Sequence, residues 1–290
     1  MNKEKIKIKE PINMCNDAMF KGLFGNINNR GMVIDFLSAI TGIKKEVLKE
    51  ADFEGGYIRK KKLVEKDKIS DVIVKIDDNN RIIVEMNGSY DKNIFNKNSQ
   101  YAFSLINETT PSNKRYSKVI LINIDNFNKL KTKKCILTYK IRDEEGNIET
   151  EIYNSIHLIL ENIVNKMYNK DVDERIIKFC KFLKMTKLEE MEERYKGDDE
   201  YMAAIRTVAE LSTDPEFVGY YDLEEAHKQD IIDAKETGYD EGKEDGITQG
   251  ISQVKIEIAK NMLKENEPIE KIINYTGLTM KEMENLEKQN

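Results

Sequence analysis

The stretch SDVIVKIDDNNRIIVEMN, residues 70–87, constrains the fold more than any other part of the chain. It contains two β-branched apolar runs separated by an Asp/Asn cluster, a pattern that indicates a β-hairpin. Side chains alternate between the faces of a strand, so Glu85 and Asn87 share one face of the second strand. Taken alone, that pattern is also typical of the water-facing side of an antiparallel sheet.

The segments around the hairpin alternate between helical and strand-like patterns. The predicted elements are helices over residues 16–26, 31–42 and 91–108 and strands over residues 116–124, 134–141 and 150–158. Together they predict an α/β fold, a mixed β-sheet flanked by helices. From residue 159 onward the apolar spacing predicts a helical C-terminal region.

This pattern divides the chain into four regions. They are an α/β domain over 1–158, a helical region over 159–235, a glycine-punctuated acidic segment over 236–253 and a small helical tail over 254–290. For the glycine-punctuated segment, a flexible linker and a closely packed helix both remain open. In the tail, Gly277 and a capping box at Thr279 and Glu282 indicate a helix-turn-helix-like unit. Its acidic charge balance favours packing or homo-oligomerisation over DNA reading.

Charge is distributed unevenly along the 290 residues. Residues 1–150 contain 28 Lys and Arg against 21 Asp and Glu, whereas residues 151–290 contain 19 against 32. The first half is therefore basic and suited to holding phosphates, and the second half repels them. The RKKK run at Arg59, Lys60, Lys61 and Lys62 is the densest basic cluster.

Several classes of protein are disfavoured by what the chain contains. Its only histidines are His157 and His227, too few for a His-based zinc site or a Ser-His-Asp triad. Cys15, Cys135 and Cys180 are widely spaced and odd in number, which disfavours a disulfide framework. No apolar run is long enough to cross a membrane, and the first residues lack a secretion signal. We therefore expect a cytoplasmic protein without membrane association.

The hairpin brings together two carboxylates that could hold a cation. Asp71 begins the first strand and Glu85 lies near the end of the second, so both fall at the end away from the turn. Their mutual repulsion would be relieved by a hard cation such as Mg²⁺. Direct pairing requires a turn of three or five residues, or a bulge near Asp71. A turn of two or four residues would place Met86 opposite Asp71 instead.

At this point the sequence resembles the PD-(D/E)XK nuclease superfamily, and within it the recombination-promoting nucleases of the Rpn family, also described as transposases. The stretches that carry the resemblance are NDAMFKGLFGN, DFLSAITG, SDVIVKIDDNNRIIVEMN, QYAFSLI and YSKVILINIDNF. Their order and spacing, rather than any one motif, make the resemblance specific. The resemblance spans most of the chain, and the first 130 residues carry nearly all of its specificity.

The resemblance implies a metal-dependent DNA endonuclease linked to recombination, mobile elements or phage defence. It assigns Asp71, Glu85 and Asn87 as catalytic residues, with Asp71 and Glu85 as ligands of Mg²⁺ or another divalent cation. Asn87 stands where the superfamily has lysine and the Rpn family usually has glutamine. It could orient a water or donate to a phosphate oxygen, but it lacks the charge of lysine.

Four further sets of residues extend the predicted site. Asp17 is either a third metal ligand or a helix N-cap. Gln100 and Tyr101 are candidate accessory residues on the helix after the hairpin, although Tyr101 fits equally well in the core. The Arg59–Lys62 run and the lysines of Lys129–Lys134 would contact the DNA backbone without reading its sequence.

Two alternatives to an active nuclease remain open. The first is a protein that kept the fold but lost catalysis, now binding DNA or serving as a scaffold; the departure at Asn87 favours it. The second is an interaction protein whose acidic helical half is the functional part. In either case the C-terminal helices are predicted to mediate homo-oligomerisation.

Overall fold

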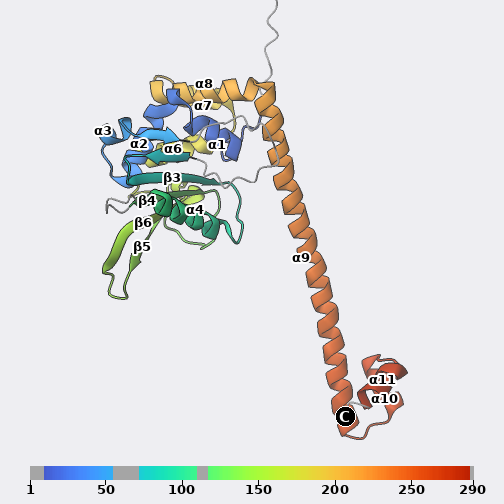
Figure 1. Ribbon diagram of the computed structural model, residues 1–290. Coiled ribbons are helices and arrows are strands. Elements are labelled where there is room, and N and C mark those ends of the chain that lie inside the picture. The colour runs from blue at the N-terminus through green and yellow to red at the C-terminus, as the bar shows by residue number, and fades with distance from the viewer. Residues whose placement is uncertain (1–9, 55–71, 110–116, 288–290) are drawn as a thin grey trace, which may run out of the picture. The chain divides into compact units, whose positions relative to one another are not determined.

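The computed structural model describes residues 10–54, 72–109 and 117–287 (Figure 1). The chain divides into two compact units, residues 1–223 and 224–290. The finer boundaries suggested by the sequence, after residues 158, 235 and 253, stay predictions.

A six-stranded mixed sheet lies at the centre of the first unit. Its strand order is β1-β2-β3-β4-β6-β5. The middle strands β3, β4 and β6 run parallel, and the outer strands are antiparallel to their neighbours. The strands are β1 (Asp52–Glu54), β2 (Val72–Lys75), β3 (Asn80–Asn87), β4 (Lys118–Asp125), β5 (Ile136–Arg142) and β6 (Ile148–Ile159). With its flanking helices, this sheet confirms the predicted α/β fold.

Helices cover both faces of the sheet (Figure 1). Helix α4 (Ile94–Thr109) packs on one face, where Ala102 and Ile106 contact Ile83 and Leu121. The opposite face, which carries Val84, packs against the other helices of the unit. These are α1 (Asp17–Phe24), η1 (Ile27–Asn29), α2 (Arg30–Thr41), α3 (Lys45–Lys49), α5 (Leu160–Val164), α6 (Glu174–Leu183), α7 (Leu188–Arg194) and α8 (Asp199–Thr213).

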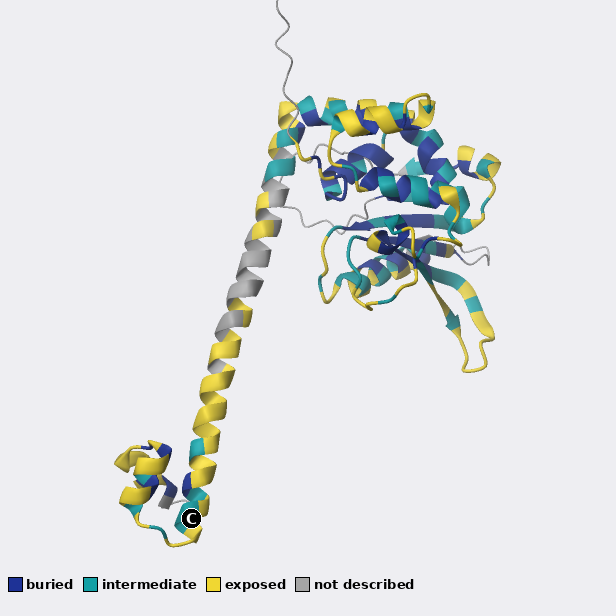
Figure 2. Cartoon of the chain, turned by 180° about the vertical axis from the view of Figure 1, so that it is seen from behind, coloured by how far each residue is buried: buried dark blue, intermediate teal, exposed yellow. Residues whose placement is uncertain are grey.

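The core is densest between the sheet and this helical layer, where buried residues concentrate (Figure 2). Four phenylalanines from three helices meet there. Phe20 stacks on Phe24 with ring centroids 4.3 Å apart, and Phe36 stacks on Phe179 at 4.1 Å. Phe24 meets Phe179 edge to face at 5.5 Å. This aromatic cluster joins α1, α2 and α6 over the sheet.

The β2–β3 hairpin closes through a three-residue turn. The backbone N–H of Ile76 donates to the carbonyl of Asn80 at 2.9 Å. The Oδ1 atom of Asp77 accepts hydrogen bonds from two backbone N–H groups of the turn, at 2.7 and 2.8 Å. This Asx-type capping fixes the loop length and hence the register, in which Val72 pairs with Val84.

One local prediction is corrected. The side chain of Asn16 caps α1 by accepting hydrogen bonds from the N–H groups of Ala18 and Met19, so the cap is Asn16 and not Asp17. The strand predicted over residues 150–158 is confirmed, because β6 ends at Ile159 and the short helix α5 begins at Leu160. Pairing with strands on both sides keeps this end of β6 extended.

In the second unit, the glycine-punctuated segment is helical. Helix α9 (Pro215–Lys264) passes through it without a break. Its four glycines are not packed closely: a Cβ atom added at any of them would meet no described atom within 4 Å, which holds for Gly238, Gly242, Gly246 and Gly250. The end of α9 packs on α10 (Ile269–Thr276) and α11 (Met280–Glu287) around Ala259 and Ile272. The tail therefore has two short helices and the end of a long one, instead of three short ones.

The predicted helix end at Gly277 and the predicted capping box at Thr279 and Glu282 are confirmed. Gly277 ends α10 with a positive φ of 66°. The N–H of Thr279 donates to Oε2 of Glu282 at 2.7 Å, and the N–H of Glu282 approaches Oγ1 of Thr279 at 3.4 Å. These contacts form the expected capping box. In the part of the chain that the structure describes, no helix has the length and apolarity needed to cross a membrane.

Candidate active site

The carboxyl ends of the three parallel strands carry polar side chains on one face. Glu85, Asn123 and His157 are register partners, in one row across β3, β4 and β6. Asn87 and Asp125 are partners in the next row. Side chains alternate along each strand, so these residues share the face of Ile83, which α4 covers. Carboxyl ends of parallel strands are common places for ligands.

The side-chain amide of Asn87 is held within the protein at both of its ends. Its Nδ2 atom donates to Oδ1 of Asp125 at 2.7 Å and to Oδ1 of Asn123 at 3.3 Å. Its Oδ1 atom accepts from Nδ2 of Asn98, on α4, at 3.1 Å. Asn87 is only 3% exposed. To touch a phosphate, this amide would have to leave its partners.

Asp125 and His157 form a buried pair beside Asn87. The Nδ1 atom of His157 lies 2.8 Å from Oδ2 of Asp125, and their side chains are 10% and 1% exposed. The Nε2 atom of His157 lies 3.3 Å from Nδ2 of Asn123 and 3.2 Å from Oγ of Ser155. An amide nitrogen can only donate, so Nε2 is an acceptor and the imidazole proton is on Nδ1, directed at Asp125.

A small cavity of about 20 Å³ adjoins this pair. Its walls include aromatic rings, the basic residue Lys129, and both Asp125 and His157. The Lys129 Nζ atom lies 5.0 Å from the centre of the Tyr90 ring and 5.6 Å from that of Phe95. A volume of about 10–15 Å³ accommodates one water, so the cavity has room for a water and not for a nucleobase.

A basic loop follows β4 next to this cavity. Its lysines, at positions 129, 131, 133 and 134, are all exposed. The loop is held in shape by two asparagines: Asn128 Nδ2 donates to the carbonyl of Thr132 at 2.7 Å, and Asn162 Nδ2 donates to the same carbonyl at 2.8 Å. Exposed lysines on a fixed loop suit contact with a phosphate backbone.

The predicted carboxylate pair is described in part. Glu85 is half-buried on β3, on the α4 face, whereas Asp71 lies outside the described residues. The turn and register are those that direct pairing of the two carboxylates requires. Over residues 10–54, 72–109 and 117–287, no group of three or more His, Cys, Asp and Glu side chains is arranged to hold a metal ion.

The accessory residues lie apart from one another. Asp17 begins α1, which packs on the sheet face opposite to that of α4. Gln100 is exposed on α4, and Tyr101 packs beside the small core cluster under the same helix. The α4 residue that touches Asn87 is Asn98. The predicted DNA-binding run Arg59–Lys62 lies outside the described residues.

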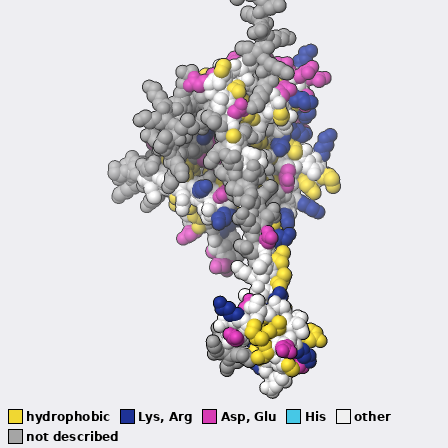
Figure 3. Space-filling view, turned by 90° about the vertical axis from the view of Figure 1, so that its right-hand side faces the viewer, with side chains coloured by type: hydrophobic (Ala, Val, Ile, Leu, Met, Phe, Trp, Pro, Cys, Tyr) yellow, Lys and Arg dark blue, Asp and Glu magenta, His cyan; other side chains and the backbone are white. Residues whose placement is uncertain are grey.

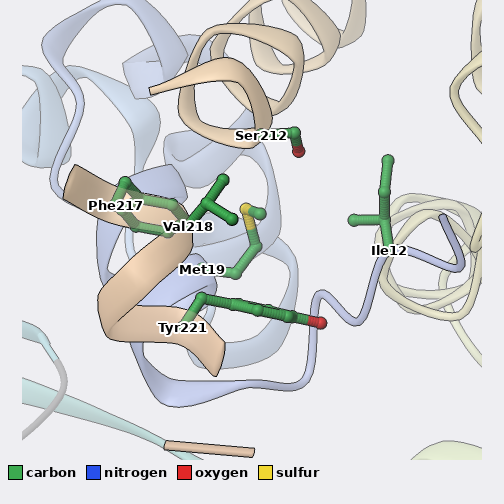
Figure 4. Close-up of a pocket in the computed structure, with 6 residues that line it drawn as sticks. All are labelled: Ile12, Met19, Ser212, Phe217, Val218 and Tyr221. Atoms are coloured by element: carbon green, nitrogen blue, oxygen red, sulfur yellow. The ribbon is translucent and has the colours of Figure 1, made fainter. Parts of the chain in front are cut away.

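Two of the buried cysteines and a second cavity lack the chemistry of a catalytic site. Burial raises the pKa of the Cys135 and Cys180 thiols above the ordinary value, which disfavours the thiolate form that a nucleophile needs. A second cavity, also about 20 Å³, lies in the first unit where α8 gives way to α9 (Figure 4). Met19, Val218 and Tyr221 are among its walls, which are mostly apolar and offer no acid–base pair.

Sequence reasoning missed most of this network. It noticed the polar–apolar–polar ending Glu85-x-Asn87 on one strand only. The same pattern ends β4, as Asn123-x-Asp125, and recurs near the end of β6, as Ser155-x-His157. Three such patterns on successive parallel strands would have indicated a shared polar face at the carboxyl edge of the sheet. With only two histidines in the chain, histidine was set aside too early.

The fold and the polar edge of the sheet define a nuclease-like α/β protein. The PD-(D/E)XK nuclease family transposase pattern matches residues 14–238, which covers the sheet, both helical layers and the first part of α9. The chain therefore belongs to the PD-(D/E)XK nuclease family transposases. No curated protein and no solved structure gives a significant match.

Proposed function

We propose that the protein is a Mg²⁺-dependent DNA endonuclease that hydrolyses phosphodiester bonds. The observation that carries the proposal is the hairpin register. The three-residue turn pairs Val72 with Val84, and continuing that register by one residue would set Asp71 opposite Glu85. Two carboxylates on directly paired positions of a hairpin can form a ligand pair for a hard divalent cation. Family membership supports the same reaction class.

The residues fit such a cation by their chemistry. Glu85 offers carboxylate oxygens from a half-buried position, and Asp71 would supply the second carboxylate. Mg²⁺ favours one or two carboxylates with the remaining positions left to water and phosphate oxygens. The chemistry such an ion supplies is stabilisation of phosphate charge and easier deprotonation of water.

The protein's own side chains would hold the DNA. The lysines of the Lys129–Lys134 loop are exposed beside the polar edge of the sheet, where they would neutralise backbone phosphates. The Arg59–Lys62 run would add to this surface. We propose a role in recombination, in mobile elements or in phage defence. The three cysteines are buried thiols, which fit a reducing, cytoplasmic location.

Cleavage of supercoiled plasmid tests the proposal. Purified protein with Mg²⁺ is expected to convert supercoiled DNA to the nicked form, and EDTA is expected to stop the reaction. The Asp71→Ala variant removes one proposed ligand and is expected to leave no detectable nicking. Nicking that persists in EDTA, or in the Asp71→Ala variant, would show a contaminant or a different site.

A second candidate function is a DNA-binding or protein-interaction module that has lost catalysis. The observation that favours it is Asn87, whose amide is 3% exposed and bound within the protein at both ends. This candidate predicts folded wild-type protein that binds plasmid in a gel shift, yet cleaves nothing with Mg²⁺, Mn²⁺ or Co²⁺.

We also propose that the protein is a homo-oligomer joined through its C-terminal helices. Along α9, Ile247, Ile251, Val254 and Ile258 follow the 4-3-4 spacing of a coiled-coil seam. Each is 44–55% exposed. Figure 3 shows hydrophobic side chains gathered along this part of the chain and over the small C-terminal unit. Two copies could bury these seams against each other.

Light scattering on the full chain tests this assembly. Wild-type protein is expected to have at least twice the monomer mass of 33.7 kDa. The double substitution Ile251→Glu/Val254→Glu places charges in the seam and is expected to return the mass to that of a monomer. The matched control Ser252→Glu/Gln253→Glu changes exposed residues outside the seam. A wild-type monomer, or equal effects of both variants, would argue against the seam.

A further inference from the structure

A closed hydrogen-bond network surrounds the Asn87 amide, and its members come from α4, β3, β4 and β6. The network consists of Asn87, Asn98, Asn123, Asp125, Ser155 and His157. All six residues are at most 9% exposed. A buried polar network of this size is costly unless its members are satisfied, and when they are satisfied it holds its side chains in one arrangement.

Donors and acceptors in this network can be assigned in only one way. Both oxygens of Asp125 accept, one from Asn87 and one from His157. Both protons of the Asn87 Nδ2 atom are used, on Asp125 and Asn123. The Asn123 Oδ1 atom also accepts from Asn98 at 2.9 Å. Turning any one amide would set a donor against a donor or an acceptor against an acceptor, so the orientation of Asn87 is fixed by its neighbours.

We infer that Asp125, His157, Asn98 and Asn123 are positioning residues that fix the Asn87 amide, with its nitrogen turned to Asp125 and its oxygen left to orient a water. The inference rests on the proposed function. An amide oxygen can accept two hydrogen bonds, and the described contacts of Asn87 Oδ1 use one, from Asn98. Its nitrogen has no proton left for a phosphate oxygen. Of the two roles open to Asn87, the network selects water orientation.

The placement of this amide matches such a role. Asn87 lies two residues beyond Glu85 on the same face of β3. Asn123, a member of the network, is the register partner of Glu85 on β4. The water that Asn87 would orient would therefore lie on the same face of β3 as Glu85. His157 is a neutral imidazole that donates its Nδ1 proton to Asp125, and this hydrogen bond holds Asp125 in place.

Asp125→Asn is the sharpest substitution. Asparagine has one side-chain oxygen where aspartate has two. Its amide nitrogen would therefore face either Nδ2 of Asn87 or Nδ1 of His157, and both of these are donors. We expect kcat for plasmid nicking to fall about 10- to 100-fold, the usual cost of losing a residue that orients a ligand, with KM within about twofold. Asp199→Asn, at an exposed position in the first turn of α8, is the matched control and is expected to change neither.

A pair of His157 variants separates positioning from packing. In His157→Asn the side-chain nitrogen falls near the place of Nδ1 and can still donate to Asp125. In His157→Gln it falls near the place of Nε2, which leaves Asp125 without that donor. We expect the asparagine variant to stay within about tenfold of wild-type kcat and the glutamine variant to resemble Asp125→Asn. The reverse order would overturn the inference.

Imidazole ¹⁵N NMR tests the network without any activity. In a His227→Gln background, where His157 is the only histidine, the spectrum is expected to show a neutral ring protonated on Nδ1. The Asn87 side-chain amide protons are expected to exchange slowly with water, and to exchange fast in Asp125→Asn. A ring protonated on Nε2 or on both nitrogens, or fast exchange in wild type, would overturn the inference. Absence of wild-type nicking overturns only the proposed function, because the NMR result is independent of it.

Discussion

Replacing Glu85 by glutamine is expected to reduce Mg²⁺-dependent nicking about 10³-fold. The substitution keeps the shape of the side chain but removes its negative charge from a half-buried position. A neutral amide is a poor ligand for a hard cation, and loss of metal-assisted charge stabilisation costs several kcal/mol; about 4 kcal/mol corresponds to that factor. The measurements are the rate of plasmid nicking and Mn²⁺ affinity by titration calorimetry, which should fall together.

Glu151→Gln is the matched control for this prediction. Glu151 is an exposed residue of β6 whose carboxylate lies 3.2 Å from Nζ of Lys118. Exposed ion pairs of this kind contribute little, so both the nicking rate and Mn²⁺ affinity should stay near wild type. Unchanged nicking and unchanged metal affinity in Glu85→Gln would remove Glu85 from the site.

The second large effect is on stability. Phe179→Ala should lower the free energy of unfolding of the first unit by about 3–5 kcal/mol, the usual cost of emptying a buried aromatic site. Phe179 is fully buried and contacts the rings of both Phe36 and Phe24, so its removal takes away the ring contacts that α6 makes with α1 and α2. Because domains have only about 5–15 kcal/mol of stability, the urea midpoint should fall by a large fraction of its value.

Phe103→Ala provides the comparison. Phe103 is 43% exposed on α4, and its ring centroid lies 4.8 Å from that of Tyr153. Much of its surface is already in water, so its truncation should cost about 1 kcal/mol or less. Equal midpoint shifts for the two variants would mean that the aromatic cluster does not hold α1, α2 and α6 together.

Local patterns in the sequence were enough to predict most of the elements. The β-branched runs around Asp77 gave the hairpin, and Asp77 itself closes its turn. Gly42 and Gly277 end their helices with positive φ, as their positions after apolar helical runs indicated. These features depend on neighbours within a few residues, which is why a single sequence contains them.

One segment stayed undecided between a linker and a helix because its local signals are weak. The glycine-punctuated segment has no local signal that separates linker from helix, because its glycines weaken a helix without excluding one. In the structure it is part of α9.

The candidate site shows the same division. The sequence by itself determined that Glu85 and Asn87 share a strand face, because alternation is a property of the extended backbone. It could not show that Asn123, Asp125 and His157 stand beside them. That arrangement depends on the order of β3, β4 and β6 in the sheet and on α4 lying over their ends. Side-chain hydrogen bonds act over about 3 Å, so residues separated by 30 or more positions become partners only when the tertiary fold brings their strands together.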